Sequence, residues 1–401
     1  MLYQRIRKFW NNIFQNKRKM ILLPLILLLV CTGCEQDTGE EKTEQGKKEQ
    51  QISEKSESLA EGYREIYETA VEQGNIDTLE VQEKIIDVIG KSGYAAVDRD
   101  NQLNMVNYEQ AEEFCENAGE KRKDHVTIIC LIEQGGLVRY DMETENGEID
   151  VTVCTVKWEE NSPEVTYYHQ FTAYSWRYTE KGYFFIEEYQ PPGYDSAPGV
   201  RAFRIKPLPE EFRKLNRKYV RPIGYEGNNL LSGNWSEKDY SELDFYDLYE
   251  HFYYQEYGEI VPYERGEGAE YQIPAEEFEN VIIPHFQISR EKLREYTTYD
   301  SGTQTYRYRP RGMNDGNLPY GPYPEVVGFE EQDDGTIRLS VEAVWERKMT
   351  DCAVSSELVV RPLEDGGFQY VSDQVTGWDE NLEMSWYTPR LTDEEWRDYY
   401  K

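Results

Sequence analysis

The feature that most constrains the fold is a change in hydrophobic periodicity that occurs twice along the chain. Apolar residues recur at helical spacing between residues 59 and 119, and then alternate with polar residues from 126 to 189. The same order returns between residues 243 and 375. Helices followed by a run of strands are typical of helices packed on an antiparallel sheet. We therefore predict an α+β fold.

Short turn signals define the predicted strands. Asn146-Gly147 is a strong hairpin signal and separates strands at 137–144 and 149–158. Further strands are predicted at 126–133, 165–178 and 183–189, and in the second half at 325–331, 336–345, 353–361 and 368–375. Among the helices of the second half, Gly258 ends the first, Pro274 opens the next and Ser289 caps a short third.

The two halves resemble each other, which suggests tandem domains. A Trp-Glu pair precedes a glycine turn in both, from Trp158 to Gly182 and from Trp345 to Gly367. We predict a first α+β domain at 59–200, a basic connector at 201–235 and a second α+β domain at 236–401. By analogy alone, each domain suggests a cystatin-like or nuclear-transport-factor-like cone.

The N-terminus has the pattern of an export signal. Residues 1–19 carry six Lys and Arg and no acid, and the apolar run from Met20 to Val30 follows at once. That run is about half the roughly 20 residues needed to cross a membrane, and Pro24 interrupts it. Residues 1–33 are therefore predicted to be a signal peptide.

Residues 30–34, Val-Cys-Thr-Gly-Cys, resemble the lipobox of bacterial lipoproteins. The resemblance implies a lipid on Cys34 and cleavage after Gly33, although Cys31 stands where leucine is usual. The alternatives are an uncleaved membrane anchor and a secretory signal without a lipid. Residues 34–58 are almost entirely polar, which predicts a disordered tether between the lipid and the folded part.

Charge and motifs exclude several functions. The chain has 77 Asp and Glu against 44 Lys and Arg, which argues against a nucleic-acid partner. The four histidines and the cysteines form no zinc pattern, and no serine-nucleophile or phosphate-loop motif occurs. We expect no metal, no cofactor and no catalytic residue. Cys115, Cys130, Cys154 and Cys352 could pair after export, but buried free thiols are the favoured interpretation.

Two surface features are candidate contacts. Eight Lys and Arg between residues 201 and 221 form a basic stretch, which could bind an acidic partner; internal pairing with carboxylates is the favoured interpretation. Four tyrosines form a stripe on the helix that Gly258 ends, and they are a candidate aromatic contact face: Tyr246, Tyr249, Tyr253 and Tyr257.

Three stretches of the C-terminal half, at 323–336, 360–371 and 387–396, are similar to a family of uncharacterised lipoproteins of gut clostridia. The resemblance covers roughly residues 220–401 and implies a Gram-positive setting, at the outer face of the cytoplasmic membrane. It implies no activity or ligand.

These observations predict a membrane-anchored extracytoplasmic lipoprotein, held through Cys34. Its expected role is non-catalytic binding of a peptide, glycan or envelope protein. The alternative is an extracytoplasmic hydrolase that uses carboxylates, for which 77 acids give no specific signal.

Overall fold

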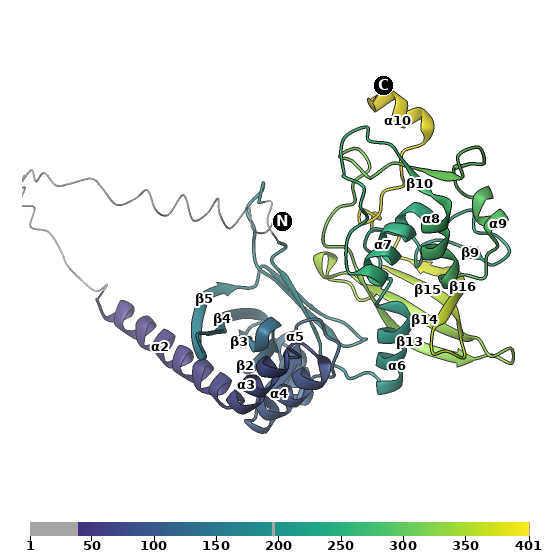
Figure 1. Cartoon of the computed structure of the whole chain (residues 1–401). Coiled ribbons are helices and arrows are strands. Elements are labelled where there is room, and N and C mark those ends of the chain that lie inside the picture. The colour runs from purple at the N-terminus through teal and green to yellow at the C-terminus, as the bar shows by residue number, and fades with distance from the viewer. Residues whose placement is uncertain (1–38, 195–196, 401) are drawn as a thin grey trace, which may run out of the picture. The chain divides into compact units, whose positions relative to one another are not determined.

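The computed structural model describes residues 39–194 and 197–400, in which helices pack on several mainly antiparallel sheets (Figure 1). Gly33 and Cys34 lie outside the described residues. No described helix is both long enough and apolar enough to cross a membrane. Residues 49–401 form one compact unit, within which an N-terminal region (49–205) and a C-terminal region (206–400) are described in turn.

The first described helix, α2 (Gly39–Glu61), corrects the predicted tether from residue 39 onward. Residues 39–58 are helical and not disordered. Glu, Gln and Lys are good helix formers, and Ile52, Ser56 and Leu59 are buried along one side of the helix. The polar composition of the segment did not indicate this buried stripe, because the stripe is narrow and one of its members is a serine. The Ser56 hydroxyl donates to the carbonyl of Ile52.

Three further helices confirm the predicted helical segment: α3 (Arg64–Gln73), α4 (Leu79–Lys91) and α5 (Tyr108–Gly119). They cover both faces of one sheet. Ile85 and Ile89 of α4 pack with Ile129, whereas Phe114 of α5 packs with Ile128. Neighbouring residues of a strand point to opposite faces, so α4 and α5 lie on opposite sides.

That sheet has the order β1-β2-β3-β4-β5, formed by β1 (Ala95–Asp98), β2 (Asp124–Leu131), β3 (Leu137–Glu145), β4 (Glu148–Glu159) and β5 (Ser162–Thr172). The Asn146-Gly147 hairpin is confirmed, with φ of 55° and 87°. Strand β1 was not predicted, and it pairs parallel with β2.

A second sheet contains β6 (Ser175–Tyr178), β7 (Tyr183–Glu187) and β8 (Val200–Arg204). The single strand predicted at 165–178 is wrong, because the chain changes partner in its middle. Ala173 N donates to Ile149 O, whereas Tyr174 N donates to Glu187 O. The N-terminal region therefore extends past residue 200 to Ile205, which is part of its core.

The predicted connector at 201–235 is folded structure. It contains β8, α6 (Glu210–Leu215), the π-helical turn η3 (Asn216–Val220) and the start of β9 (Trp235–Ser236). Leu215, Tyr219 and Leu230 belong to the core of the C-terminal region. Arg204, Lys206, Arg217 and Arg221 form salt bridges, so internal pairing is confirmed for these four.

The C-terminal region places helices and a small sheet on a five-stranded sheet (Figure 1). Its helices are α7 (Phe245–Tyr257), α8 (Ala275–Ile282), α9 (Arg290–Glu295) and α10 (Asp393–Tyr400), and the small sheet has β10 (Tyr271–Pro274), β11 (Tyr299–Asp300) and β12 (Thr305–Tyr308). Two predicted helix ends are confirmed. Gly258 ends α7 in a left-handed conformation, and the Ser289 side chain accepts from Lys292 N at the start of α9.

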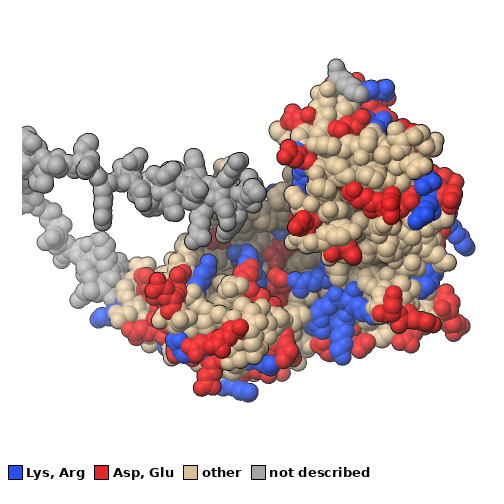
Figure 2. Space-filling model, in the orientation of Figure 1, with Lys and Arg blue, Asp and Glu red and all other residues tan. Residues whose placement is uncertain are grey.

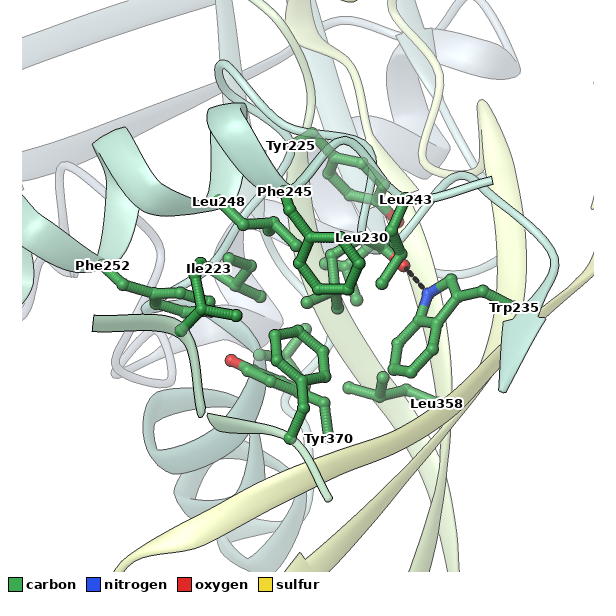
Figure 3. Close-up of a cluster of buried hydrophobic side chains, with 14 of the residues drawn as sticks. Ile223, Tyr225, Leu230, Trp235, Leu243, Phe245, Leu248, Phe252, Leu358 and Tyr370 are labelled. Carbon is green, nitrogen blue, oxygen red and sulfur yellow. Dashed lines mark hydrogen bonds between the residues drawn. The ribbon is translucent and has the colours of Figure 1, made fainter. Parts of the chain in front are cut away.

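The five-stranded sheet has the order β13-β14-β15-β16-β9, with β13 (Tyr323–Glu331), β14 (Ile337–Val344), β15 (Val354–Pro362) and β16 (Phe368–Trp378). These confirm the predicted strands. Figure 3 shows how Phe245, Leu248 and Phe252 of α7 gather over Leu358 and Tyr370 of the sheet, while Trp235 donates to Leu230 O at 2.8 Å.

The two halves do not superimpose in their order of strands. Gly182 precedes β7 of the separate three-stranded sheet, whereas Gly367 precedes β16 within the five-stranded sheet. The similar spacings that suggested a tandem repeat therefore link elements that are not equivalent.

A buried contact joins the two regions. Glu325 of β13 accepts from the Tyr183 hydroxyl at 2.9 Å and lies 3.3 Å from Nη1 of Arg204 in β8. All three side chains are buried. We call Tyr183, Arg204 and Glu325 the seam.

Candidate functional site

A large cleft of about 890 Å³ is lined by both regions. Strands β2, β3, β4 and β8 of the N-terminal region contribute to its lining, and the C-terminal region contributes residues 320–321, the start of β13 and residues 346–347. Figure 2 shows a hollow on one face of the molecule, with Lys and Arg gathered beside it on a surface rich in Asp and Glu.

The floor of the cleft is largely apolar. Cys130, Val138 and Thr155 line it from three adjacent strands, and the sheet register places them directly beside one another. Tyr140 and Phe203 extend this surface and stack edge to face at 5.1 Å. Burial raises the pKa of Cys130 to about 12, so the thiol stays neutral and is a poor nucleophile.

The charged side chains of the cleft are only partly neutralised. Arg99 pairs with Glu133 at 2.6 Å, and Arg221 pairs with Asp100 at 2.6 Å. Three other cations that line the cleft have no carboxylate within ion-pair distance in the described part of the chain: Lys157, Arg201 and Arg347. In a chain with 33 more acids than bases, three unpaired cations around one cavity favour an anionic ligand.

Among the acids of the cleft, Glu159 and Glu346 have no ion-pair partner in the described part of the chain, and Glu159 is exposed. Glu346 is half-buried. It follows the buried Trp345 and begins the short helix η5 (Glu346–Lys348). Its carboxyl group forms no hydrogen bond or salt bridge with any described residue. Burial raises the pKa of Glu346 to about 7, although the positive charges of Arg201 and Arg99 oppose this increase. Near neutral pH the carboxyl group can therefore either donate or accept a hydrogen bond.

A second cavity of about 460 Å³ lies beside the start of α7. Its arginines are already paired: Arg307 and Arg309 bind Asp393 at 2.7 Å, and Arg390 binds Asp247 and Glu250. Burial and the neighbouring Asp247 raise the pKa of Asp244 to about 6, but Asp244 accepts from the amides of Tyr246 and Asp247 as the helix cap. These charges stabilise the fold and are not free for a ligand.

The tyrosine stripe is not the contact face that we predicted. Tyr249 is fully buried and donates to Glu277, and Tyr246 and Tyr253 are half-buried. Tyr257 alone among the four is exposed, at 54%. The helical spacing reports the packing of α7 against α8, because Tyr249 stacks on Phe278. None of the four lines the cleft.

Sequence reasoning named Arg201, Arg221 and Cys130 but did not place them in one cleft. Arg201 belongs to the basic stretch, but it has no carboxylate partner among the described residues, unlike Arg204 and Arg217. Glu346 was noted only as part of a Trp-Glu pair, and nothing placed it or Arg347 at a site, because both lie more than a hundred residues from the strands they face. No cluster of His, Cys, Asp and Glu in residues 39–194 and 197–400 could hold a metal ion.

A comparison with known families finds a match over residues 49–390 to a model described as a family of unknown function (DUF6070). The match covers both regions and the whole cleft. No curated protein and no solved structure matches the chain.

Proposed function

The chain belongs to a family of unknown function, DUF6070, and we propose that it is an extracytoplasmic lipoprotein that binds a ligand in the cleft without catalysis. The observation that carries the proposal is the combination of an apolar floor with unpaired charges in one large cavity. A concave cavity that combines an apolar surface with polar groups able to orient a ligand is typical of a ligand site. The ligand is a peptide, a glycan or a segment of an envelope protein.

The anchoring part of the proposal rests on the sequence of residues 1–34. The basic start, the short apolar run and the small residues before Cys34 support a lipid anchor at the outer face of the cytoplasmic membrane. The similarity of the C-terminal half to lipoproteins of gut clostridia favours a Gram-positive cell. In this proposal the chain attaches to the membrane through a palmitate-containing diacylglycerol on Cys34.

A hydrolase is the second candidate, because the pKa of Glu346 near 7 suits a general acid. Glycoside hydrolysis generally requires a second free carboxylate beside the first. Asp100 and Glu133 of the cleft are bound by Arg221 and Arg99, and Cys130 is neutral. The fourth acid, Glu159, has no partner among the described residues, but it is exposed at the end of β4 and not enclosed with Glu346. These pairings favour binding over catalysis.

The lipid anchor can be tested by growing expressing cells with an alkyne-tagged palmitate. We expect the wild-type protein to incorporate the tag and Cys34→Ala to lose it completely, because the acceptor thiol is gone. Cys31→Ala is the matched control and keeps the tag. Labelling that follows Cys31, or none in the wild type, would refute the assignment of Cys34.

Ligand binding in the cleft can be tested by filling it. Val138 lies on the floor, and Val138→Trp should weaken binding at least ten-fold, which corresponds to about 1.4 kcal/mol. Short peptides, oligosaccharides and solubilised envelope proteins are titrated in turn against the lipidated full-length protein in detergent. Val71→Trp, an exposed position on α3 outside the cleft, is the control. A ligand whose affinity is equal in both variants binds elsewhere.

A further inference from the structure

Strand β8 lies at the edge of its sheet and forms one wall of the cleft. The hydrogen bonds at the two ends of β8 show which of its peptide groups face β7. Gly199 O accepts from Glu188 N, and Ile205 N donates to Gly182 O. In an antiparallel pair the amide groups of alternate residues face the partner strand, so the odd-numbered residues of β8 face β7 and the even-numbered ones face away.

Asn101 occupies one part of this open edge. Its amide nitrogen donates to Ala202 O at 3.1 Å, and its side-chain oxygen accepts from Arg204 N at 2.9 Å. A side-chain amide thus takes the place of one peptide group of a neighbouring strand. These bonds confirm that Ala202 and Arg204 present their backbone away from β7.

Two backbone donors of this edge are left without a partner in the described part of the chain. The N–H groups of Val200 and Ala202 point away from β7, and no acceptor for either is found among the described residues. Both residues are more than 90% buried. Buried backbone N–H groups are nearly always paired, so two such donors at the wall of a cleft indicate that a ligand supplies their acceptors.

The charges nearby define the rest of the ligand. Arg201, between these two residues, has an exposed side chain that donates to the carbonyl of Val200 at 3.3 Å. Arg201 and Glu346 line the same cleft without forming a salt bridge with each other. A carboxylate can bind the guanidinium, an adjacent N–H can donate to Glu346, and an apolar side chain can cover Val138 and Tyr140.

We propose that the cleft binds the C-terminal end of an extended peptide, which pairs with the edge of β8, places its terminal carboxylate at Arg201 and lays an apolar side chain on the floor. Addition of a strand to a sheet edge is a common mode of peptide recognition, and capture of a terminal carboxylate is another. The inference rests on the proposed function and specifies its ligand.

The experiment uses fluorescein-labelled tetrapeptides with apolar C-terminal residues, prepared with a free carboxylate or a terminal amide. We expect the free acids to bind the lipidated protein in detergent about 10- to 150-fold more tightly, the range for a hydrogen bond to a charged group. Arg201→Met should reduce the affinity for the acids to that for the amides and leave the amides unchanged. Arg177→Met is the control, because Arg177 also lacks a carboxylate partner among the described residues but lies outside the cleft.

Hydrogen exchange gives an independent reading of the strand pairing. The amides of Val200 and Ala202 should exchange more slowly when the peptide is bound, while those of the edge strand β5 stay unchanged. Equal binding of acids and amides, or no protection at Val200 and Ala202, would overturn the inference. If an oligosaccharide binds instead and Val138→Trp blocks it, the proposed function stands and the peptide inference fails. If nothing binds the cleft, both fail.

Discussion

Replacing Asp247 by alanine is expected to lower the free energy of unfolding by about 3–5 kcal/mol, the cost of leaving a buried charge unpaired. The Asp247 side chain is 1% exposed. It accepts from Arg311 at 2.8 and 2.5 Å, from Arg390 at 2.9 Å and from the Tyr387 hydroxyl at 3.1 Å. Removing it leaves two arginines in the interior, where neighbouring charges still hold Arg390.

Urea unfolding followed by tryptophan fluorescence measures the effect. Asp247→Asn preserves the shape of the side chain and should also destabilise the protein, because it removes the charge. Glu256→Ala, at an exposed position of the same helix, is the matched control and should change stability by less than about 0.5 kcal/mol. A loss below about 1 kcal/mol for Asp247→Ala would mean that the arginines find other partners.

Replacing Glu325 by alanine is the second change with a large expected effect. We expect a loss of about 3 kcal/mol, because Arg204 would remain buried with the Lys181 carbonyl, at 2.8 Å, as its remaining hydrogen-bond acceptor. The loss lies at the lower end of the range for buried pairs, since burial raises the pKa of Glu325 and its charge is costly in the wild type.

Calorimetry of the Glu325→Ala protein tests the seam directly. Because the seam joins the N- and C-terminal regions, we expect the heat absorption peak to broaden or split into two. Glu331→Ala, at an exposed end of the same strand, is the control. The double variant Arg204→Met, Glu325→Leu should recover most of the stability, as apolar replacement of a whole buried pair does. If the double variant does not recover stability, the stability of the seam depends on the shape of its side chains more than on their charges.

Local patterns predicted much of the fold. The Asn146-Gly147 turn, the end of α7 at Gly258 and the Ser289 cap depend on residues close in sequence, and all three are confirmed. The parallel pairing of β1 could not be predicted, since its four residues give no alternation and their partner lies beyond α5. The helix at 39–58 was not predicted because the polar average composition of this segment indicated disorder. The two buried positions that hold the helix against the fold, Ile52 and Ser56, are too few to change that average.

The candidate site was much less predictable than the fold. Arg201 and Glu346 are 145 positions apart in the sequence, and neither belongs to a motif that indicates a binding site. Their relation depends on the packing of the two regions around the cleft. The tyrosine stripe was wrong for a related reason, because the same helical spacing describes a surface face and a face packed on another helix, as Tyr249 is on Phe278.

The four described cysteines have a consequence for how the protein matures. All are free thiols, three of them buried, and burial raises the pKa of each. Thiols that rarely ionise react slowly with oxidants and with disulfides. The chain can therefore reach its native state without an electron acceptor or a disulfide-forming enzyme, and its folded form is suited to reducing and oxidising surroundings alike.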